Sequence, residues 1–280
     1  MTEHTTVREV AGPWSLATSR AFWEGFAPAA LDQQDGDTLR TVFLAEREWT
    51  AVSATVRQAG TAAHTTVTGT GDLDAAAAQV ARFLSLDVDG RGWPAVGDRD
   101  PVIGAAQREL PGLRPCGFHS PYEAAAWAVL SQRLRVSQAA RLRIDLIDRH
   151  GADGAFPAPD RLRELDLDLP GRKTEYLHAV ADAALDGLLD GAALREVPPE
   201  AAIERVRKIK GLGPFAAELV VLRGANHPDG LPQHEGRLDE EIAFRYGSGV
   251  APDRVAQAWR PYRTWAAVHL RVLREKRLHS

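Results

Sequence analysis

The 280-residue chain contains a single cysteine, Cys116, and only four lysines against thirty arginines. One cysteine cannot form an internal disulfide, a four-cysteine zinc site or an iron–sulfur cluster held by cysteines. No run of residues approaches the roughly 18 apolar residues of a membrane span, and the first residues lack the apolar core of a signal peptide. These absences predict a cytoplasmic protein without a disulfide or a cysteine-bound cluster.

The motifs of several large enzyme classes are absent as well. The sequence has no HExxH zinc motif, no Walker phosphate loop, no glycine-rich dinucleotide turn and no GxSxG elbow. Their absence argues against a metalloprotease, a nucleotide hydrolase and an esterase.

The charge of the chain is unevenly distributed. Hydrophobic residues make up 44% and charged residues 26% of the sequence, which is typical of a globular protein with a buried core. The formal net charge is −4, but residues 1–100 carry 8 basic and 14 acidic side chains, whereas residues 101–280 carry 26 and 24. This balance argues against a protein that coats nucleic acid non-specifically and leaves room for a local basic surface.

The first third of the sequence has a mixed α and β pattern. Residues 38–58 and 61–70 are rich in Val and Thr and alternate with a period of two in places, which predicts antiparallel strands. Residues 15–26 and 72–86 are expected to form helices, the second with an acidic start and an alanine-rich body.

The remainder of the sequence has a helical pattern. Helices are expected at residues 101–110, 121–150, 172–189, 198–208, 214–224, 237–246 and 252–277. Several of them begin at proline, a residue that suits the first position of a helix.

The most informative segment is residues 208–224, KIKGLGPFAAELVVLRG. Gly211 and Gly213 bracket Leu212 and allow a tight turn whose amides are not covered by side chains. Exposed amides beside a helix N-terminus bind anions such as a DNA phosphate, and Lys210 adds positive charge. Leu212 is expected to anchor the turn in the core. Taken alone, this turn is also compatible with an ordinary connection between two helices.

Together with other segments, residues 208–224 resemble the helix-hairpin-helix of the base-excision DNA glycosylases. Four more segments follow the order of the 3-methyladenine DNA glycosylase II family: residues 100–133 (DPVIGAAQRELPGLRPCGFHSPYEAAAWAVLSQR), 156–165 (FPAPDRLREL), 171–185 (GRKTEYLHAVADAAL) and 259–270 (WRPYRTWAAVHL). The resemblance covers about residues 100–272 and extends more weakly to residues 13–29 (PWSLATSRAFWEGFAPA).

The resemblance implies a mainly α-helical glycosylase fold, in which two helical subdomains flank a cleft, preceded by an N-terminal α+β domain with an antiparallel sheet. The N-terminal domain is expected at residues 1–95 and the helical region at residues 96–280. Within the helical region, residues 113–230 form the expected central subdomain, with the hairpin at 209–213. Residues 96–112 and 231–280 together form the expected second subdomain.

The resemblance also implies a catalytic carboxylate in the loop after the second hairpin helix. In the family an aspartate there stabilises the oxocarbenium-like transition state and orients a water molecule. In residues 230–242 (GLPQHEGRLDEEI), the best match is Glu235, three residues after Pro232. Glutamate departs from the family pattern because it is one methylene longer than aspartate. His234 and Asp239 are alternatives, and Glu235 as a solvated loop residue or a cap of the next helix is another.

Other positions define the expected reaction and base pocket. Bifunctional relatives carry a Schiff-base lysine where this chain has Phe215, so the resemblance implies a monofunctional enzyme that leaves an abasic site. The residues expected to line the base pocket are Phe215, Leu219, Arg271, Trp127, Tyr122 and Phe26, with core packing as the alternative for the last three. An arginine at Arg271 disfavours a cationic base, which suggests bulky or neutral adducts as substrates.

The resemblance assigns the remaining DNA contacts. In LSQRL (residues 130–134), Arg133 matches the wedge that fills the gap left by a flipped base, with Gln132 beside it; a surface arginine is the alternative. Lys210, Gly211 and Gly213 are the expected phosphate contacts. The family's hairpin binds a monovalent cation, so a structural Na⁺ or K⁺ is implied at the backbone carbonyls of Arg207, Ile209 and Leu212, and no other cofactor is implied.

These features predict a monofunctional DNA glycosylase of base-excision repair. It is expected to act as a monomer on double-stranded DNA that contains a damaged base, in the bacterial nucleoid and away from membranes. The first alternative is a lesion-binding protein that shares the scaffold but cleaves weakly or not at all. The second is a helical DNA-binding module unrelated to repair.

Overall fold

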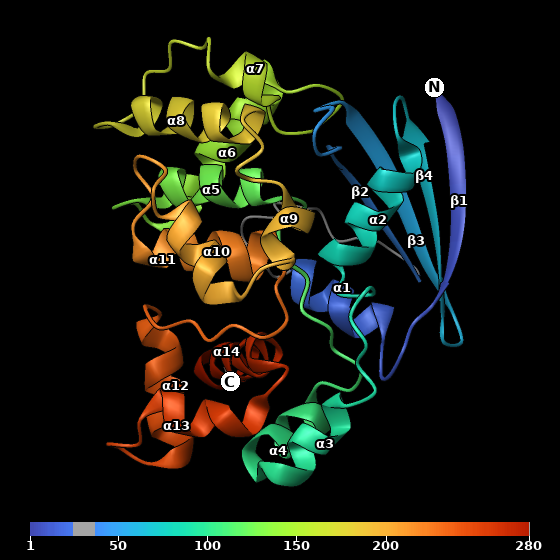
Figure 1. Ribbon diagram of the computed structural model, residues 1–280, viewed down its shortest axis with the longest axis vertical. Helices are drawn as coiled ribbons and strands as arrows, with labels where there is room; N and C mark the ends of the chain where they lie inside the picture. Colours follow the sequence, from blue (N-terminus) through green and yellow to red (C-terminus); the bar gives the residue numbers. More distant parts are fainter. Residues whose placement is uncertain (25–36, 280) are drawn as a thin grey trace.

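The computed structural model describes residues 1–24 and 37–279. Its N-terminal part contains a four-stranded antiparallel sheet in the order β1-β4-β3-β2 (Figure 1). The elements of this part are β1 (Thr2–Glu9), α1 (Leu16–Glu24), β2 (Thr38–Leu44), β3 (Ala51–Ala59), β4 (Ala62–Gly69) and α2 (Leu73–Phe83). The antiparallel strands and the two helices predicted here are confirmed, and a turn divides residues 38–58 into two strands.

The sequence pattern does not predict β1. None of its eight residues is buried, so the strand shows no apolar alternation. It is ordered as a strand because its backbone pairs with β4, from Thr2 opposite Gly69 to Glu9 opposite Ala62. A strand that is polar on both faces gives no hydrophobic signal, and only its pairing partner defines it.

One face of the sheet packs against α2 and forms the core of the N-terminal domain. Val52, Ala54 and Val56 of β3 alternate into this core, and Val67 of β4 lies in the same cluster. Asp72 caps α2 by accepting a hydrogen bond from the amide of Ala75 at 2.9 Å.

The rest of the chain is helical, as predicted. The helices before the hairpin are α3 (Trp93–Arg99), α4 (Pro101–Glu109), α5 (Pro121–Ser131), α6 (Val136–His150), α7 (Pro159–Leu162), α8 (Lys173–Leu185), α9 (Gly191–Arg195) and α10 (Pro199–Val206). They are followed by α11 (Pro214–Leu219), the π-helix η2 (Val220–Gly224), α12 (Gly236–Tyr246), α13 (Pro252–Ala256), the 3-10 helix η3 (Gln257–Trp259) and α14 (Arg263–His279). None of the helices in the described ranges is long and apolar enough to span a membrane.

Two helices that the sequence predicts as continuous are broken in the structure. Residues 121–150 divide into α5 and α6, because the buried amine of Lys173 donates to the carbonyls of Val129 (2.8 Å) and Gln132 (2.7 Å) where α5 ends. Residues 252–277 divide into α13, η3 and α14, with the last break at Pro261, which has no amide to continue a helix.

The helices form two groups with separate apolar cores. One core lies among α5, α6, α8, α10, α11 and η2 and includes Leu130, Val180 and Val221. The other joins α3 and α4 to α12, η3 and α14, and it includes Ile103 and Trp259. The helices α3 and α4, which precede the first group in the sequence, therefore pack against η3 and α14, which follow it (Figure 1).

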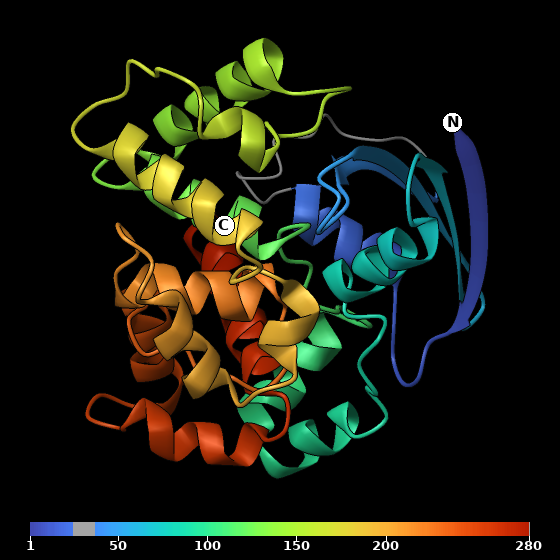
Figure 2. The ribbon, with the colours of Figure 1, turned by 45° about the horizontal axis from the view of Figure 1, so that its top comes forward.

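The buried guanidinium of Arg114 joins the N-terminal domain to the helices. It donates hydrogen bonds to the carbonyls of Ser85 (2.7 Å), Val88 (2.9 Å) and Pro13 (3.0 Å). Burial lowers the pKa of Arg114 to about 10. Figure 2 shows the resulting arrangement, with both helical groups on one side of the sheet and β1 on the far edge.

Candidate active site and DNA interface

The predicted hairpin lies between α10 and α11. Gly211 has φ +91°, a conformation that favours glycine, and a Cβ atom there would overlap the ring of Tyr176. Leu212 is buried, as predicted, and belongs to the core of the hairpin group. Gly213, by contrast, is exposed, and nothing lies within 4 Å of the place where its Cβ would be. The backbone at Gly213, directly before the first residue of α11, is thus open to a ligand.

Lys210 does not stand free beside the turn. Its amine forms an ion pair with Glu175 of α8, and the same carboxylate binds Arg172 at 2.5 Å. Hydrogen bonds from Arg172 and Lys210 lower the pKa of Glu175 to about 2. A phosphate at the hairpin would therefore compete with Glu175 for the Lys210 amine.

The predicted wedge occupies the break between α5 and α6. Arg133 is exposed and has φ +56°, a strained conformation for a residue with a side chain. Such strain persists where the surroundings fix the backbone, and it is frequent at functional sites. Here Gln132 donates from its side chain to the carbonyl of Gly211 at 2.8 Å, while Lys173 holds the Gln132 carbonyl. The wedge segment and the hairpin are consequently hydrogen-bonded to each other.

Glu235 is the residue directly before α12. Its backbone carbonyl accepts from the amides of Leu238 (2.9 Å) and Asp239 (3.2 Å), but its side chain makes no capping bond. Instead, Glu235 Oε1 lies 2.7 Å from Nε of Arg271 on α14, and the two side chains are 24% and 21% exposed. The carboxylate is therefore a partly buried group held from another helix and not a cap.

Two arginines control the charge of Glu235. Burial raises its pKa, and the positive charges of Arg271 and Arg223 oppose that rise. Arg271 also reaches Glu275 at 3.4 Å, and its Nη1 is buried without a hydrogen-bond partner among the described residues. The site thus combines the carboxylates of Glu235 and Glu275 with the guanidinium groups of Arg271 and Arg223, and Arg237 adds a further positive charge near Glu235.

Arg223 was not singled out from the sequence. It lies on the π-helix η2, donates from Nη2 to the carbonyl of Cys116 at 2.7 Å, and has its guanidinium 5.4 Å from the ring centroid of Phe22. Burial lowers its pKa to about 10, and the charge of Glu235 opposes that shift. π-Helical turns are rare and frequent at functional sites, and hydrophobic periodicity does not reveal them.

The two alternatives to Glu235 have other surroundings. His234 Nδ1 lies 2.7 Å from Glu218 Oε1, a second carboxylate that the sequence did not single out. Asp239 lies in the first turn of α12, and burial, with the nearby charge of Glu218, raises its pKa. Among these three residues, only Glu235 forms an ion pair with Arg271 in the described structure.

The expected pocket residues fall into two sets. Phe215 is 49% exposed and Leu219 is half-buried, and their spacing places both on one face of α11. Trp127 and Tyr122 are buried in the core instead, and the Tyr122 hydroxyl donates to the carbonyl of Pro157 at 2.8 Å. Both residues thus have the surroundings of the alternative considered for them, core packing. Phe26 lies outside the described residues.

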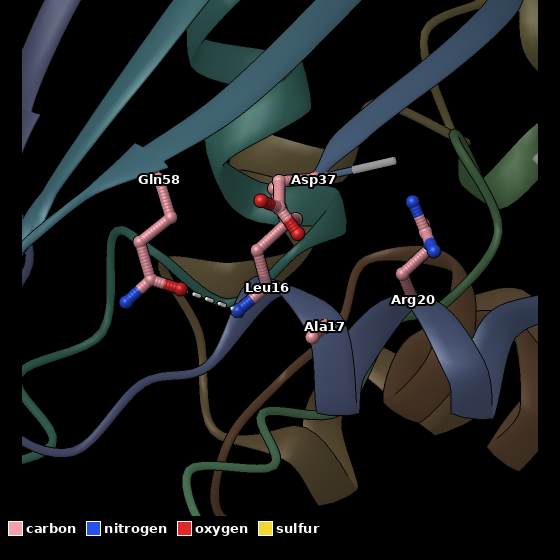
Figure 3. A pocket seen from close by; sticks show the side chains of 5 residues that line it. All are labelled: Leu16, Ala17, Arg20, Asp37 and Gln58. Carbon is pink, nitrogen blue, oxygen red and sulfur yellow. Dashed lines mark hydrogen bonds between the residues drawn. The ribbon is translucent and has the colours of Figure 1, made fainter. Parts of the chain in front are cut away.

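Two hollows in the described part of the chain lie away from these residues. One is lined by Leu16, Ala17, Arg20, Asp37 and Gln58 in the N-terminal domain (Figure 3). There Gln58 Oε1 accepts the amide of Leu16 at 2.7 Å, a contact that caps α1. A second hollow lies between α3, α4 and the turn that follows α4. Neither contains a residue of the candidate site, and no group of three or more His, Cys, Asp or Glu side chains in the described ranges is arranged to hold a metal ion.

Several curated proteins similar to this chain are DNA-3-methyladenine glycosylases. No protein-family model matches the chain. The chain is 24% identical over 207 residues to the DNA-3-methyladenine glycosylase of Bacillus subtilis, which covers 67% of this chain and 68% of that protein. It is 30% identical over 185 residues to DNA-3-methyladenine glycosylase 2 of Escherichia coli, which covers 60% of this chain and 62% of that protein.

The fold comparison gives the same result. The 3-methyladenine DNA glycosylase from Archaeoglobus fulgidus matches with a TM-score of 0.76 over 96% of this chain and 98% of that one, at 16% identity, which shows a shared fold. The Schizosaccharomyces pombe 3-methyladenine DNA glycosylase, solved in complex with abasic DNA, matches with a TM-score of 0.50 and 25% identity over 60% of this chain and 88% of that one. The predicted mainly helical glycosylase fold is confirmed, and the sequence of the chain is similar to those of several 3-methyladenine DNA glycosylases.

Proposed function

We propose that the protein is a monofunctional DNA glycosylase of base-excision repair. It would flip an alkylated base out of duplex DNA, hydrolyse the N-glycosidic bond and leave an abasic site. The observation that carries this proposal is the partly buried carboxylate of Glu235, which lies in the loop after the hairpin's second helix. Its Oε1 is 2.7 Å from Nε of Arg271 on α14. Double-stranded DNA with a damaged base is the proposed partner, bound by one copy of the chain.

The proposed binding step uses the hairpin and the wedge. The open backbone at Gly213 and the amide of Gly211 receive a DNA phosphate, with Lys210 supplying charge once it leaves Glu175. Arg133 then enters the gap left by the flipped nucleotide, and Gln132 stays bonded to the hairpin. The hydrogen bond from Gln132 to the Gly211 carbonyl supports this order of events. Because the bond joins the two segments, binding of a phosphate at the hairpin also sets the position of Arg133 relative to the DNA.

The proposed chemical step uses Glu235. As the bond between C1′ and the base nitrogen breaks, its electron pair leaves with the base and the sugar gains oxocarbenium character. The ionised carboxylate stabilises that positive charge and accepts the proton of the water that adds to C1′. Phe215, where bifunctional relatives carry a lysine, has no amine, so no Schiff base forms and the strand stays intact.

We further propose that neutral adducts are better substrates than cationic methylpurines. The guanidinium group of Arg271 lies beside Glu235 and would repel a cationic base, whereas its buried Nη1, which has no hydrogen-bond partner among the described residues, could donate to a neutral one. Phe215 supplies an aromatic ring on the exposed face of α11, which suits stacking on a neutral base.

A monovalent cation at the hairpin fits the same proposal. The amide of Leu212 donates to the carbonyl of Ile209 at 3.1 Å, and a carbonyl oxygen retains a second lone pair after one such bond. The carbonyls of Arg207, Ile209 and Leu212 would hold the Na⁺ or K⁺, whose charge would attract a DNA phosphate. The proposal requires no other cofactor.

A panel of damaged duplexes tests the proposed function. The protein is incubated with duplexes that carry 3-methyladenine, 7-methylguanine, ethenoadenine or hypoxanthine, and each sample is then divided and treated with or without alkali. Strand cleavage only after alkali is the expected result, with faster excision of the neutral lesions. Cleavage without alkali would overturn the monofunctional assignment, and faster excision of the methylated cations would overturn the preference.

A lesion-binding protein without efficient cleavage is the second candidate. Two observations favour it: Arg271 already occupies the Glu235 carboxylate, and glutamate replaces the family aspartate. Tight binding to one of the four lesion duplexes with no alkali-sensitive product would support this candidate over the first.

Replacing Arg271 by methionine is expected to move the acidic limb of the excision rate to higher pH by about 1 unit or more. Burial already raises the pKa of Glu235, and Arg271 opposes that rise, so its loss raises the pKa further. Activity that needs the ionised carboxylate is present above this pKa and falls as the pH drops through it. The measurement is the single-turnover rate against pH.

The matched control for Arg271→Met is Glu275→Gln. It removes the other carboxylate near Arg271, at 3.4 Å, and leaves the Glu235 contact in place. Its acidic limb should stay where it is in the unmodified protein. An unmoved limb in Arg271→Met would contradict the proposed control of Glu235 by Arg271.

A further inference from the structure

Glu218 is a buried carboxylate that no step proposed above uses. It lies on α11, whose other residues are all apolar (PFAAEL), and it is 5% exposed. Burying an ionised carboxylate is costly unless donors satisfy its oxygens. Glu218 therefore needs hydrogen-bond donors for its two carboxylate oxygens. In the structure these donors come from one segment, the loop before α12.

The partners of Glu218 all belong to the loop before α12. Oε2 accepts from the backbone amides of Gln233 (3.1 Å) and His234 (3.0 Å), and Oε1 pairs with His234 Nδ1 at 2.7 Å. Two of these three donors are backbone groups, so the carboxylate fixes the path of the main chain and not only a side chain. We call these three contacts of Glu218 with Gln233 and His234 the Glu218 clamp. The residue that follows His234 is Glu235.

We propose that Glu218 is a positioning residue for Glu235, and that His234 holds the second oxygen of Glu218 so that both backbone amides reach the first. The proposal rests on the proposed function. Arg271 fixes the carboxylate end of Glu235, and Glu218 fixes the backbone from which that side chain extends. Because α11 begins directly after Gly213, the clamp also joins the catalytic loop to the element that grips the phosphate.

The extra methylene of Glu235 makes a fixed backbone position more important for catalysis. A longer side chain has one more rotatable bond and reaches the sugar correctly only if its backbone is held in one place. Misplacing a reacting group by about 1 Å can cost about 100-fold in rate. If the backbone at Gln233 and His234 were free to move, the Glu235 carboxylate could be displaced by that distance. The Kd for duplex DNA, which depends on the hairpin, would not change.

The test compares single-turnover excision with duplex binding in three variants. Glu218→Ala removes all three acceptor contacts and should lower the excision rate about 100-fold while the Kd for lesion duplex stays unchanged. Glu218→Gln keeps an oxygen for the two backbone amides and should restore most of the rate. His234→Ala keeps the backbone bonds and should fall between the two. This order of rates at constant Kd is what a merely structural role would not produce.

A second buried glutamate provides the control for lost stability. Glu123 on α5 is 3% exposed, and its carboxylate pairs with Arg143 at 2.9 Å and His119 at 3.7 Å, neither of which belongs to the loop before α12. Glu123→Gln should lower the melting temperature and leave the excision rate of the folded protein unchanged. If Glu218→Ala does not fold, the ranking of Glu218→Gln and His234→Ala against this control decides the question.

Two results would overturn the inference. One is wild-type excision by Glu218→Ala or, if that variant does not fold, by His234→Ala. The other is a loss of rate and binding together, in proportion to lost stability. Failure of the proposed function looks different, because Glu235→Gln would then excise normally. An inactive Glu235→Gln beside a fully active Glu218→Ala would leave the proposed function standing and remove only the clamp.

Discussion

Glu235→Gln is expected to lower the rate of base excision by about 100- to 1000-fold without weakening the binding of lesion duplex. Glutamine has the same length and shape but no charge, so it cannot stabilise an oxocarbenium-like sugar or take a proton from water. Its loss of negative charge also removes repulsion toward phosphates, so the Kd should be unchanged or lower. Single-turnover excision and equilibrium binding on the same duplex measure the two effects separately.

Asp239→Asn is the matched control for this prediction. Asp239 is a carboxylate of the same loop-to-helix junction, and burial raises its pKa as it does for Glu235. It forms no ion pair with Arg271 in the part of the chain that the structure describes, so its amide variant should excise at the normal rate. Normal excision by Glu235→Gln would refute the catalytic assignment, and an inactive Asp239→Asn beside it would transfer the role to Asp239.

Gly213→Val is expected to raise the Kd for damaged and undamaged duplex alike by about tenfold or more, with an unchanged melting temperature. A Cβ at Gly213 meets nothing within 4 Å in the protein, and the residue has φ −80°, which valine adopts without strain. The added side chain therefore fills only the space that a phosphate would occupy. A charge-assisted hydrogen bond to phosphate contributes about 1.5 to 3 kcal/mol, which sets the expected loss.

The neighbouring glycine provides the contrast. Gly211 has φ +91°, and a Cβ there would overlap Tyr176, so Gly211→Ala should lower the melting temperature. Binding curves for Gly213→Val at several salt concentrations should also show a shallower salt dependence, since a phosphate contact is lost. Unchanged binding to both duplexes would remove the proposed role of this turn, and a loss confined to damaged duplex would assign Gly213 to the base pocket.

The fold was predictable where local sequence carries the signal. Asp72 marks the start of α2, and the paired glycines at 211 and 213 mark the hairpin. The break between α5 and α6 has no such signal, because neither glycine nor proline lies between Pro121 and Gly151. The break depends on Lys173, which lies about forty residues further along the chain. Its amine donates hydrogen bonds to the carbonyls of Val129 and Gln132 at the end of α5.

The candidate site was predictable only in outline. The order of motifs pointed to Glu235, Arg271 and Arg133, because each lies in a segment that resembles the family. The sequence did not show that Arg271 binds Glu235, since 36 positions separate them and the contact requires α14 to pack against α12. Glu218 and Arg223 were missed for the same reason, and a lone charge within the apolar helix PFAAELVVL was the one available signal for Glu218.

By itself, the sequence determined the likeness to 3-methyladenine DNA glycosylases, the glycine turn of the hairpin and the absence of a Schiff-base lysine at Phe215. The turn and the missing lysine are properties of short segments, in which residue type and local backbone preference are sufficient, and the likeness depends on the order of several such segments. Only the tertiary structure decided how Glu235 is held, how the wedge is joined to the hairpin and which carboxylates are paired. Those properties depend on burial and on contacts between distant helices, and neither is written in the spacing of residues along the chain.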